Sequence, residues 1–405
     1  MDDTQWLTFC KYARRVKTFR PCGARVPVQV EQEFISSLQH CPTSYLPLLP
    51  NVTDLEWSEL SFSTLDGSGI SLLKYFVGPA VTTVTLSLQR WLVYPSPKPA
   101  ILADLPKFCP NVTSFTVVVG LLWEYQPCRE VGRMVTQWPR LHTLRTCALP
   151  QPMMDQLFSR RTLESLYLDY HRSSPNYIGR IPDAVCEFTL GVDSSSLCTR
   201  ILETVYASPT RFHLAVGMNE RPEEAEFKKT FHLLPLRLDT SRLLSLTIQP
   251  RASIVGIPIP MWHTLELREL LVSTFVKFAA LRELDLDLFC TAEMSDADYA
   301  HVAGSLVHLR SLKLGAANPF ISRPWPAASI GAVIAVLRYC KHLETLHLLF
   351  NASIPPPGGL TMPDGRVALS EELVRQGCIQ QMYYQALRWL FANRGCDYWR
   401  HSILL

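Results

Sequence analysis

The sequence lacks the features that would identify an enzyme, a membrane protein or a nucleic-acid-binding protein. It contains no glycine-rich nucleotide-binding motif, no H-E-x-x-H motif of zinc proteases and no G-x-S-x-G motif of serine hydrolases. We therefore expect no enzymatic activity and no cofactor. No apolar run approaches the length of about 18 residues that a membrane span needs. A net charge of +3 over 405 residues also makes nucleic acid and anionic membranes unexpected partners.

Signals for secretion are also missing. The chain begins Met-Asp-Asp-Thr-Gln-Trp, which is acidic where a signal peptide would be basic, and no apolar segment follows. Twelve cysteines without such a signal indicate free thiols in a reducing compartment. We therefore expect a cytoplasmic or nuclear protein. Its apolar fraction of 47% excludes a largely disordered chain.

What the sequence does have is a repeated phrase of the form L-x-x-L-x-L, which returns roughly every 20 to 40 residues. Repetition of this kind is typical of a leucine-rich-repeat solenoid, in which each phrase forms one short strand. The clear copies begin at Val52, Val81, Val112, Leu141, Leu163, Leu243, Leu281, Leu309 and Leu343.

Degenerate copies at Val185 and Phe212, with an opening copy at Val16, raise the prediction to about eleven parallel strands. Between the phrases, apolar residues recur at helical spacing. The fold class predicted is therefore an α/β solenoid, with strands on its concave side and helices on its convex side. We expect irregular repeats over residues 1–350, and a Pro/Gly loop with a C-terminal capping helix over residues 351–405. A partner-binding role is the alternative for this last helix.

Cysteines and asparagines in the repeats favour structural roles. Cys109 and Cys340 each lie three residues before a phrase, and no C-x-x-C pair or zinc-ligand spacing exists, so no metal site is expected. Asn51 and Asn111 belong to N-x-T triplets, but their place before a strand favours turns over glycosylation. Other phrases have apolar residues at the position of these two cysteines: Leu49, Trp138, Phe278 and Leu306.

Residues that alternate with the apolar positions of each phrase should line the concave face. Their character varies most at the fourth position after the start of a phrase, which is typical of a recognition surface. The acidic trio Glu283, Asp285 and Asp287 either binds a basic group of a partner or pairs with Lys313 on the next strand. A merely solvated face is the further alternative. The predicted partner-binding residues are Glu283, Asp285, Asp287, Lys313, His347, Tyr167 and Arg145.

Three segments carry a resemblance to a known family. The stretch Trp6-Leu-Thr-Phe-Cys-Lys-Tyr-Ala-Arg-Arg-Val-Lys-Thr-Phe-Arg resembles the entry into the repeats of fungal F-box proteins of the mushroom-forming lineage. Segments 48–57 and 108–115, both containing Pro-Asn-Val-Thr, resemble later repeats of the same proteins. The resemblance covers about residues 6 to 350 and implies that the repeats recruit substrates for an SCF-type ubiquitin ligase.

The F-box, which docks the ligase adaptor in such proteins, has no recognisable start before Trp6, so an SCF adaptor is not a firm expectation. The function predicted is a protein-binding leucine-rich-repeat module that resembles an F-box substrate receptor. Two alternatives stay open. One is a stand-alone repeat scaffold without a ubiquitin connection, and the other is a regulator of the GTPase-activating type, in which a loop arginine acts on the partner.

Overall fold

The computed structural model shows how the repeated phrases pair into a sheet. It describes residues 3–20, 33, 36–38, 40–58, 72–88, 98–119, 125–171, 174, 177–217, 224–251, 268–287, 293–315, 326–348 and 350–351. The C-terminal helix expected after residue 351 lies outside this part. The chain forms two compact units, residues 1–190 and 191–405. Among the described helices, none is both long and apolar enough to cross a membrane.

Each phrase forms one strand of a twelve-stranded sheet, in the order β1-β2-β3-β4-β5-β6-β8-β10-β11-β12-β13-β14. The twelve strands correspond to the nine clear copies, the two degenerate copies and the opening copy, close to the expected number of about eleven. The solenoid-like arrangement of parallel strands and helices is confirmed. The strands are β1 (Thr18–Phe19), β2 (Asp54–Ser58), β3 (Thr83–Leu88), β4 (Ser114–Val119), β5 (Thr143–Cys147), β6 (Ser165–Tyr170), β8 (Glu187–Val192), β10 (Arg211–Val216), β11 (Ser245–Pro250), β12 (Glu283–Leu286), β13 (Ser311–Leu314) and β14 (Thr345–Leu348).

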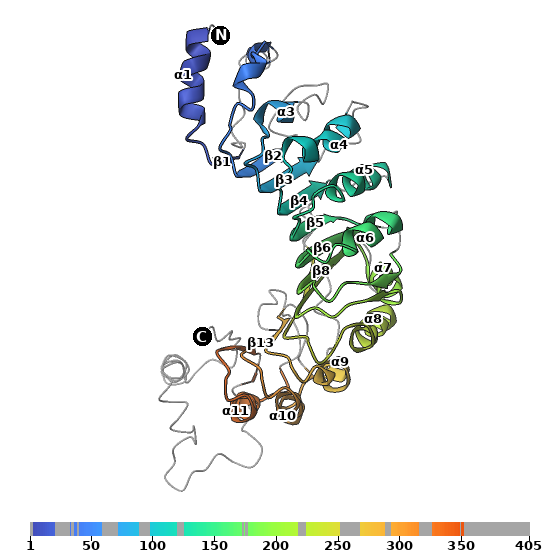
Figure 1. The fold of residues 1–405 in the computed structure, drawn as a ribbon. Coiled ribbons are helices and arrows are strands. Elements are labelled where there is room, and N and C mark those ends of the chain that lie inside the picture. Colours follow the sequence, from blue (N-terminus) through green and yellow to red (C-terminus); the bar gives the residue numbers. More distant parts are fainter. Residues whose placement is uncertain are drawn as a thin grey trace, which may run out of the picture. The chain divides into compact units, whose positions relative to one another are not determined.

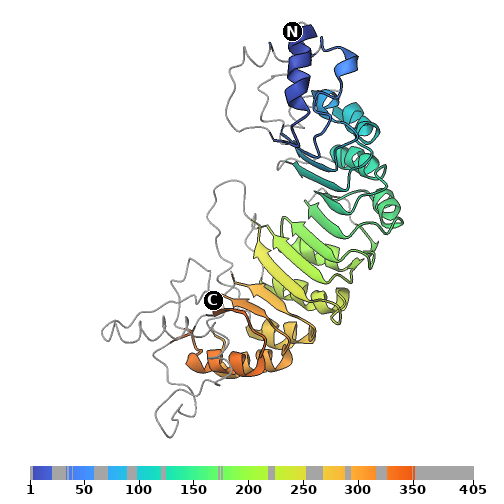
Figure 2. The ribbon, with the colours of Figure 1, turned by 60° about the vertical axis from the view of Figure 1, so that its left-hand side comes forward.

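Helices connect the strands. Within each unit the helices between the strands lie on one face of the sheet, and no described helix between strands lies on the other, as Figures 1 and 2 show; α1 precedes the first strand. Two further short strands are β7 (Gly179–Arg180) and β9 (Val205–Tyr206), and 3-10 turns are η1 (Thr43–Tyr45) and η5 (Phe275–Lys277). The helices are α1 (Asp3–Ala13), α3 (Leu73–Phe76), α4 (Lys98–Phe108), α5 (Tyr125–Val135), α6 (Gln151–Phe158), α7 (Ser195–Leu202), α8 (Glu224–Arg237), α9 (Arg268–Ser273), α10 (Asp296–Ser305) and α11 (Ile330–Tyr339).

The second leucine of each phrase forms a buried row across neighbouring strands. In residues 191–405 this row runs Phe212, Leu246, Leu284, Leu312 and Leu346, each in direct register with the next. Every one of them is at most 1% exposed. A one-residue shift in register would move the whole row to the open face, so the spacing of the phrase fixes the pairing of the strands.

Backbone hydrogen bonds repeat with the same period where each strand begins. The carbonyl of Arg282 accepts the N–H groups of Arg310 and Ser311, at 2.7 and 3.0 Å. In turn, the carbonyl of Arg310 accepts those of Glu344 and Thr345, at 2.6 and 2.9 Å. The same pattern joins each strand to the next from β2 through β5. These bonds satisfy backbone groups at the edge of the sheet and hold that edge in a fixed geometry.

The positions assigned to cysteine and asparagine have the expected structural roles. Cys109 and Cys340 are fully buried. Burial raises the pKa of the Cys109 thiol to about 12 and that of Cys340 to about 11, so neither is a thiolate at neutral pH. The side-chain amide of Asn51 donates to the Arg14 carbonyl at 2.7 Å, and that of Asn111 donates to the Pro79 carbonyl at 2.8 Å. Both asparagines therefore connect one turn to the preceding one.

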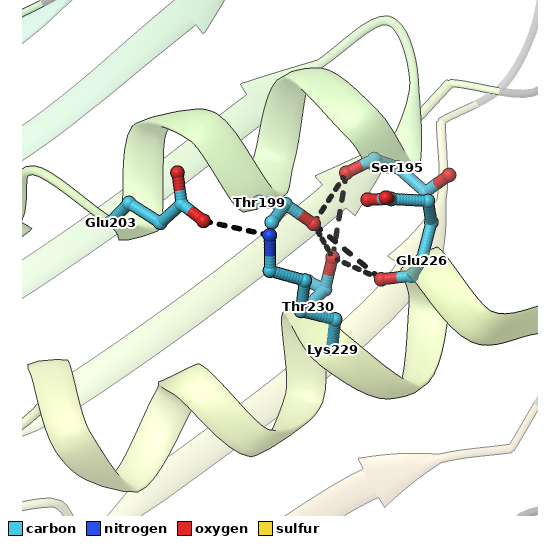
Figure 3. Close-up of polar contacts among 6 residues, drawn as sticks. All are labelled: Ser195, Thr199, Glu203, Glu226, Lys229 and Thr230. Carbon is cyan, nitrogen blue, oxygen red and sulfur yellow. Dashed lines mark hydrogen bonds and ion pairs between the residues drawn. The ribbon is translucent and has the colours of Figure 1, made fainter.

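A buried hydroxyl pair joins α7 and α8 (Figure 3). The hydroxyl oxygens of Thr199 and Thr230 lie 2.6 Å apart, and each residue is at most 3% exposed. The Glu226 carbonyl lies 3.0 Å from the Thr230 hydroxyl, and the Ser195 carbonyl lies 3.2 Å from the Thr199 hydroxyl. One threonine donates to the other, which donates in turn to its carbonyl, so both hydroxyl protons have an acceptor and the contact can be buried between the helices.

Candidate functional site

The strands of the second unit place a row of polar side chains on the open face of the sheet. Direct register joins His213 to Thr247, Thr247 to Asp285, Asp285 to Lys313, and Lys313 to His347. Their neighbours along each strand are buried, because side chains of a strand alternate between the two faces. The open face of β10 to β14 is therefore a polar surface on a rigid backbone.

Three of the predicted residues, Asp285, Lys313 and His347, lie side by side in this row. The Lys313 ammonium is 3.2 Å from the Asp285 carboxylate, and their side chains are 33% and 20% exposed. Glu283 lies in the row alongside and is exposed. Both acidic residues of β12 and the lysine are thus within reach of a partner, although Asp285 is already paired.

Asp287 lies deeper than its two acidic neighbours. Its side chain is 11% exposed. The carboxylate lies 3.0 Å from His347 Nδ1 and forms a hydrogen bond or an ion pair with it. Gly315 directly follows the intervening strand β13, and with a φ of 69° it adopts a conformation that favours glycine. Asp287 therefore holds the imidazole ring in place and offers little surface of its own.

The two remaining predicted residues belong to the first unit and form a cluster of their own. Arg145 on β5 is in register with Tyr167 on β6, and its guanidinium carbon lies 4.3 Å from the centre of the tyrosine ring. This cation–π contact stiffens both side chains on the open face. In the same row, Arg20 lies 3.6 Å from Glu56, where both side chains are largely exposed.

Our sequence reasoning missed two residues of the open face, Arg211 and His213. The phrase on β10 lacks its first leucine, so its alternate positions were not counted. The signal was nevertheless present, because counting back from Phe212 places Arg211 in register with Ser245 and Glu283 in the structure. Arg211 is exposed and adds a positive charge two strands away from the acidic strand β12.

These contacts show what the open face can do chemically. Charged and hydrogen-bonding groups lie in a fixed order across three strands, because Asp285 pairs with Lys313 and Asp287 pairs with His347. Within the described ranges, no group of three or more His, Cys, Asp or Glu side chains is arranged to hold a metal ion. A surface of this kind suits recognition of polar groups on another macromolecule, where fixed charge order favours one partner over others.

Comparisons of the chain with protein-family models and with curated proteins found no match. The function is therefore argued from the structure together with the resemblance noted in the repeats.

Proposed function

We propose that the chain is a protein-binding repeat module whose partner docks on the open face of β11 to β14. The observation that carries the proposal is the row Asp285, Lys313 and His347, which presents a carboxylate, an ammonium and an imidazole group in order on three adjacent strands. Adjacent strands lie about 4.8 Å apart, so a single partner segment can contact all three residues. The described helices between these strands cover the other face, and none of them lies over this one.

Side chains that are already ordered lower the entropy cost of association. Lys313 is tied to Asp285, and His347 is tied to Asp287. A partner that contacts them does not need to immobilise free side chains, which would cost about 0.5–1.5 kcal/mol each. Pairing with Lys313, an alternative raised from the sequence, is thus found for Asp285, and the fixed order of side chains that results supports the docking proposal.

The resemblance to mushroom-lineage F-box proteins extends the proposal to the fate of the partner. In that interpretation the bound protein is a substrate presented to an SCF-type ubiquitin ligase. Ubiquitination of the captured protein should then fall when the gene for this chain is deleted. Unchanged ubiquitination would favour the stand-alone scaffold and would leave the binding proposal intact.

The binding proposal itself is tested by capture of proteins on the immobilised chain, followed by their identification. Lys313→Glu places a negative charge in the row, and Lys341→Glu makes the same change at an exposed turn residue outside it. We expect a protein that the unmodified chain and Lys341→Glu both retain to be lost from Lys313→Glu. Equal retention by all three would contradict docking on the open face.

A further inference from the structure

A second surface lies at the edge of the sheet where β11 to β14 begin, away from the row on the open face. Here a hollow of about 280 Å³ is lined by Leu244, Ala280, Arg282, His308, Arg310 and His342. None of the lining residues is acidic. We infer that this edge groove binds an acidic segment of a protein partner, with a carboxylate held between Arg282 and Arg310. The inference names a chemical class for the partner and so rests on the proposed protein-binding function.

The repeat itself creates the groove. Arg282 and Arg310 each follow the first leucine of a phrase, and His308 and His342 each precede one. Ala280 occupies the corresponding preceding position of its own phrase. Because alanine is far smaller than the histidines beside it, the surface is hollow at this point. The two arginines directly precede the neighbouring strands β12 and β13, so their backbones are about 4.8 Å apart.

Two successive arginines occupy this position in the C-terminal repeats. In the first unit only the opening phrase has a lysine there, and the others have neutral or acidic residues or a histidine: Lys17, Thr53, Thr82, Thr113, His142 and Glu164. A solvated sheet edge therefore does not require arginine here. The concentration of cationic groups around one hollow points to an anionic ligand.

The two guanidinium groups are available to such a ligand. Arg282 is exposed and has no ion-pair partner in the part of the chain that the structure describes. Arg310 lies 3.5 Å from Glu344, with side chains that are 54% and 68% exposed. An exposed pair of this kind contributes little to stability, so exchanging Glu344 for a carboxylate of the partner costs little.

The backbone beneath these side chains is held before any ligand arrives. The N–H of Arg282 donates to the Leu244 carbonyl at 2.7 Å, and the N–H of Arg310 donates to the Arg282 carbonyl at 2.7 Å. Arginine presents planar pairs of donors that match the two oxygens of a carboxylate. The half-buried Leu244 forms an apolar floor against which the aliphatic stem of a glutamate can pack.

The size of the groove decides between a side chain and a larger ligand. Pockets for cofactors and drug-sized molecules usually occupy about 300–1,000 Å³ and enclose most of their ligand. A hollow of about 280 Å³ open to solvent suits one or two side chains of a segment that passes over it. An acidic peptide is therefore the occupant that fits both the volume and the charge.

The test is a binding titration of the full chain with a fluorescein-labelled peptide of alternating glutamate and aspartate. Its control is the same peptide made of glutamine and asparagine. Loss of one charged hydrogen-bonding contact should weaken binding about tenfold, so Arg282→Gln should raise the dissociation constant by that factor. Arg338→Gln removes the same charge from the exposed side of α11, outside the groove, and should change the constant less than twofold.

Ala280→Leu tests the hollow separately from the charge. The substitution fills the groove and removes no cation. It should therefore weaken binding of the acidic peptide about tenfold, while the melting temperature of the chain changes little. Binding that tolerates Ala280→Leu would indicate diffuse charge attraction and would overturn the inference. So would equal weakening by Arg282→Gln and Arg338→Gln, or equal binding of the acidic and amide peptides.

These outcomes are distinct from failure of the open-face proposal. A partner held only by the row on β12 to β14 would still be captured by Arg282→Gln and lost from Lys313→Glu. If no protein is captured at all, the peptide titration still reports on the groove.

Discussion

Leu312→Ala is the substitution that most directly tests how the repeats are packed. Leu312 is fully buried on β13 and lies in register between Leu284 on β12 and Leu346 on β14. Removing its branched end loses the transfer free energy of three carbon groups and leaves a cavity between fixed strands. Leucine-to-alanine changes at such sites cost about 2–5 kcal/mol. Because the backbone on both sides is hydrogen-bonded, collapse of the cavity is limited, and we expect the upper half of this range.

The assay is chemical denaturation followed by circular dichroism. Lys313→Ala is the matched control, since it changes the next residue of the same strand on the opposite face. Its partially exposed pair with Asp285 is worth about 1 kcal/mol or less. Leu312→Ala should therefore lower the free energy of unfolding several times more than Lys313→Ala. Equal effects, or a loss below about 0.5 kcal/mol for Leu312→Ala, would mean that Leu312 does not face the interior.

Three further predictions concern groups away from the open face. Thr230→Val removes a buried hydroxyl that contacts Thr199, and it should lower the free energy of unfolding by about 1 kcal/mol, while an increase would refute the role of the contact. Cys109 should not react with a thiol reagent at pH 7 until the chain unfolds, because burial raises its pKa to about 12; rapid modification in the native state would contradict this. Burial alone would raise the pKa of Asp298, but hydrogen bonds from Ser295 and Arg268 keep that pKa below its ordinary value. The contribution of Asp298 to the free energy of unfolding is therefore present above its unfolded pKa of about 3.9 and disappears as the pH falls through its lower folded pKa. The difference in free energy of unfolding between the unmodified chain and Asp298→Asn should therefore narrow below about pH 4. A difference that stays constant from pH 7 to 3 would count against this ion pair.

The periodic parts of the fold were predictable because short-range sequence spacing determines them. The leucines of each phrase define which side chains point inward, and the register of the strands follows from them. The same reasoning placed Asp285, Lys313 and His347 on one surface. Helix α11 forms between two phrases, as expected of the intervening segments, and it buries Ala332, Val333, Val336 and Leu337.

Contacts between distant side chains were not predictable in this way. Asp287 meets His347 sixty residues later, from the strand on the far side of β13. The hydroxyl pair of Thr199 and Thr230 joins two helices in a region where the phrases are degenerate. The edge groove depends on Ala280 being small beside larger neighbours. In each case the contact depends on which side chains neighbouring repeats bring together, which hydrophobic periodicity does not record.

The central claim is that a protein partner recognises the order of charges on the open face of β12 and β13. The double substitution Asp285→Lys with Lys313→Asp tests it most directly, because it keeps the net charge and the ion pair but exchanges their positions. The measurement is the dissociation constant of the captured partner, with the melting temperature recorded alongside. We predict that the exchange weakens binding at least tenfold while the melting temperature stays within about 2 °C, since an ion pair is present in both forms. Unchanged affinity in a folded double variant would contradict the claim.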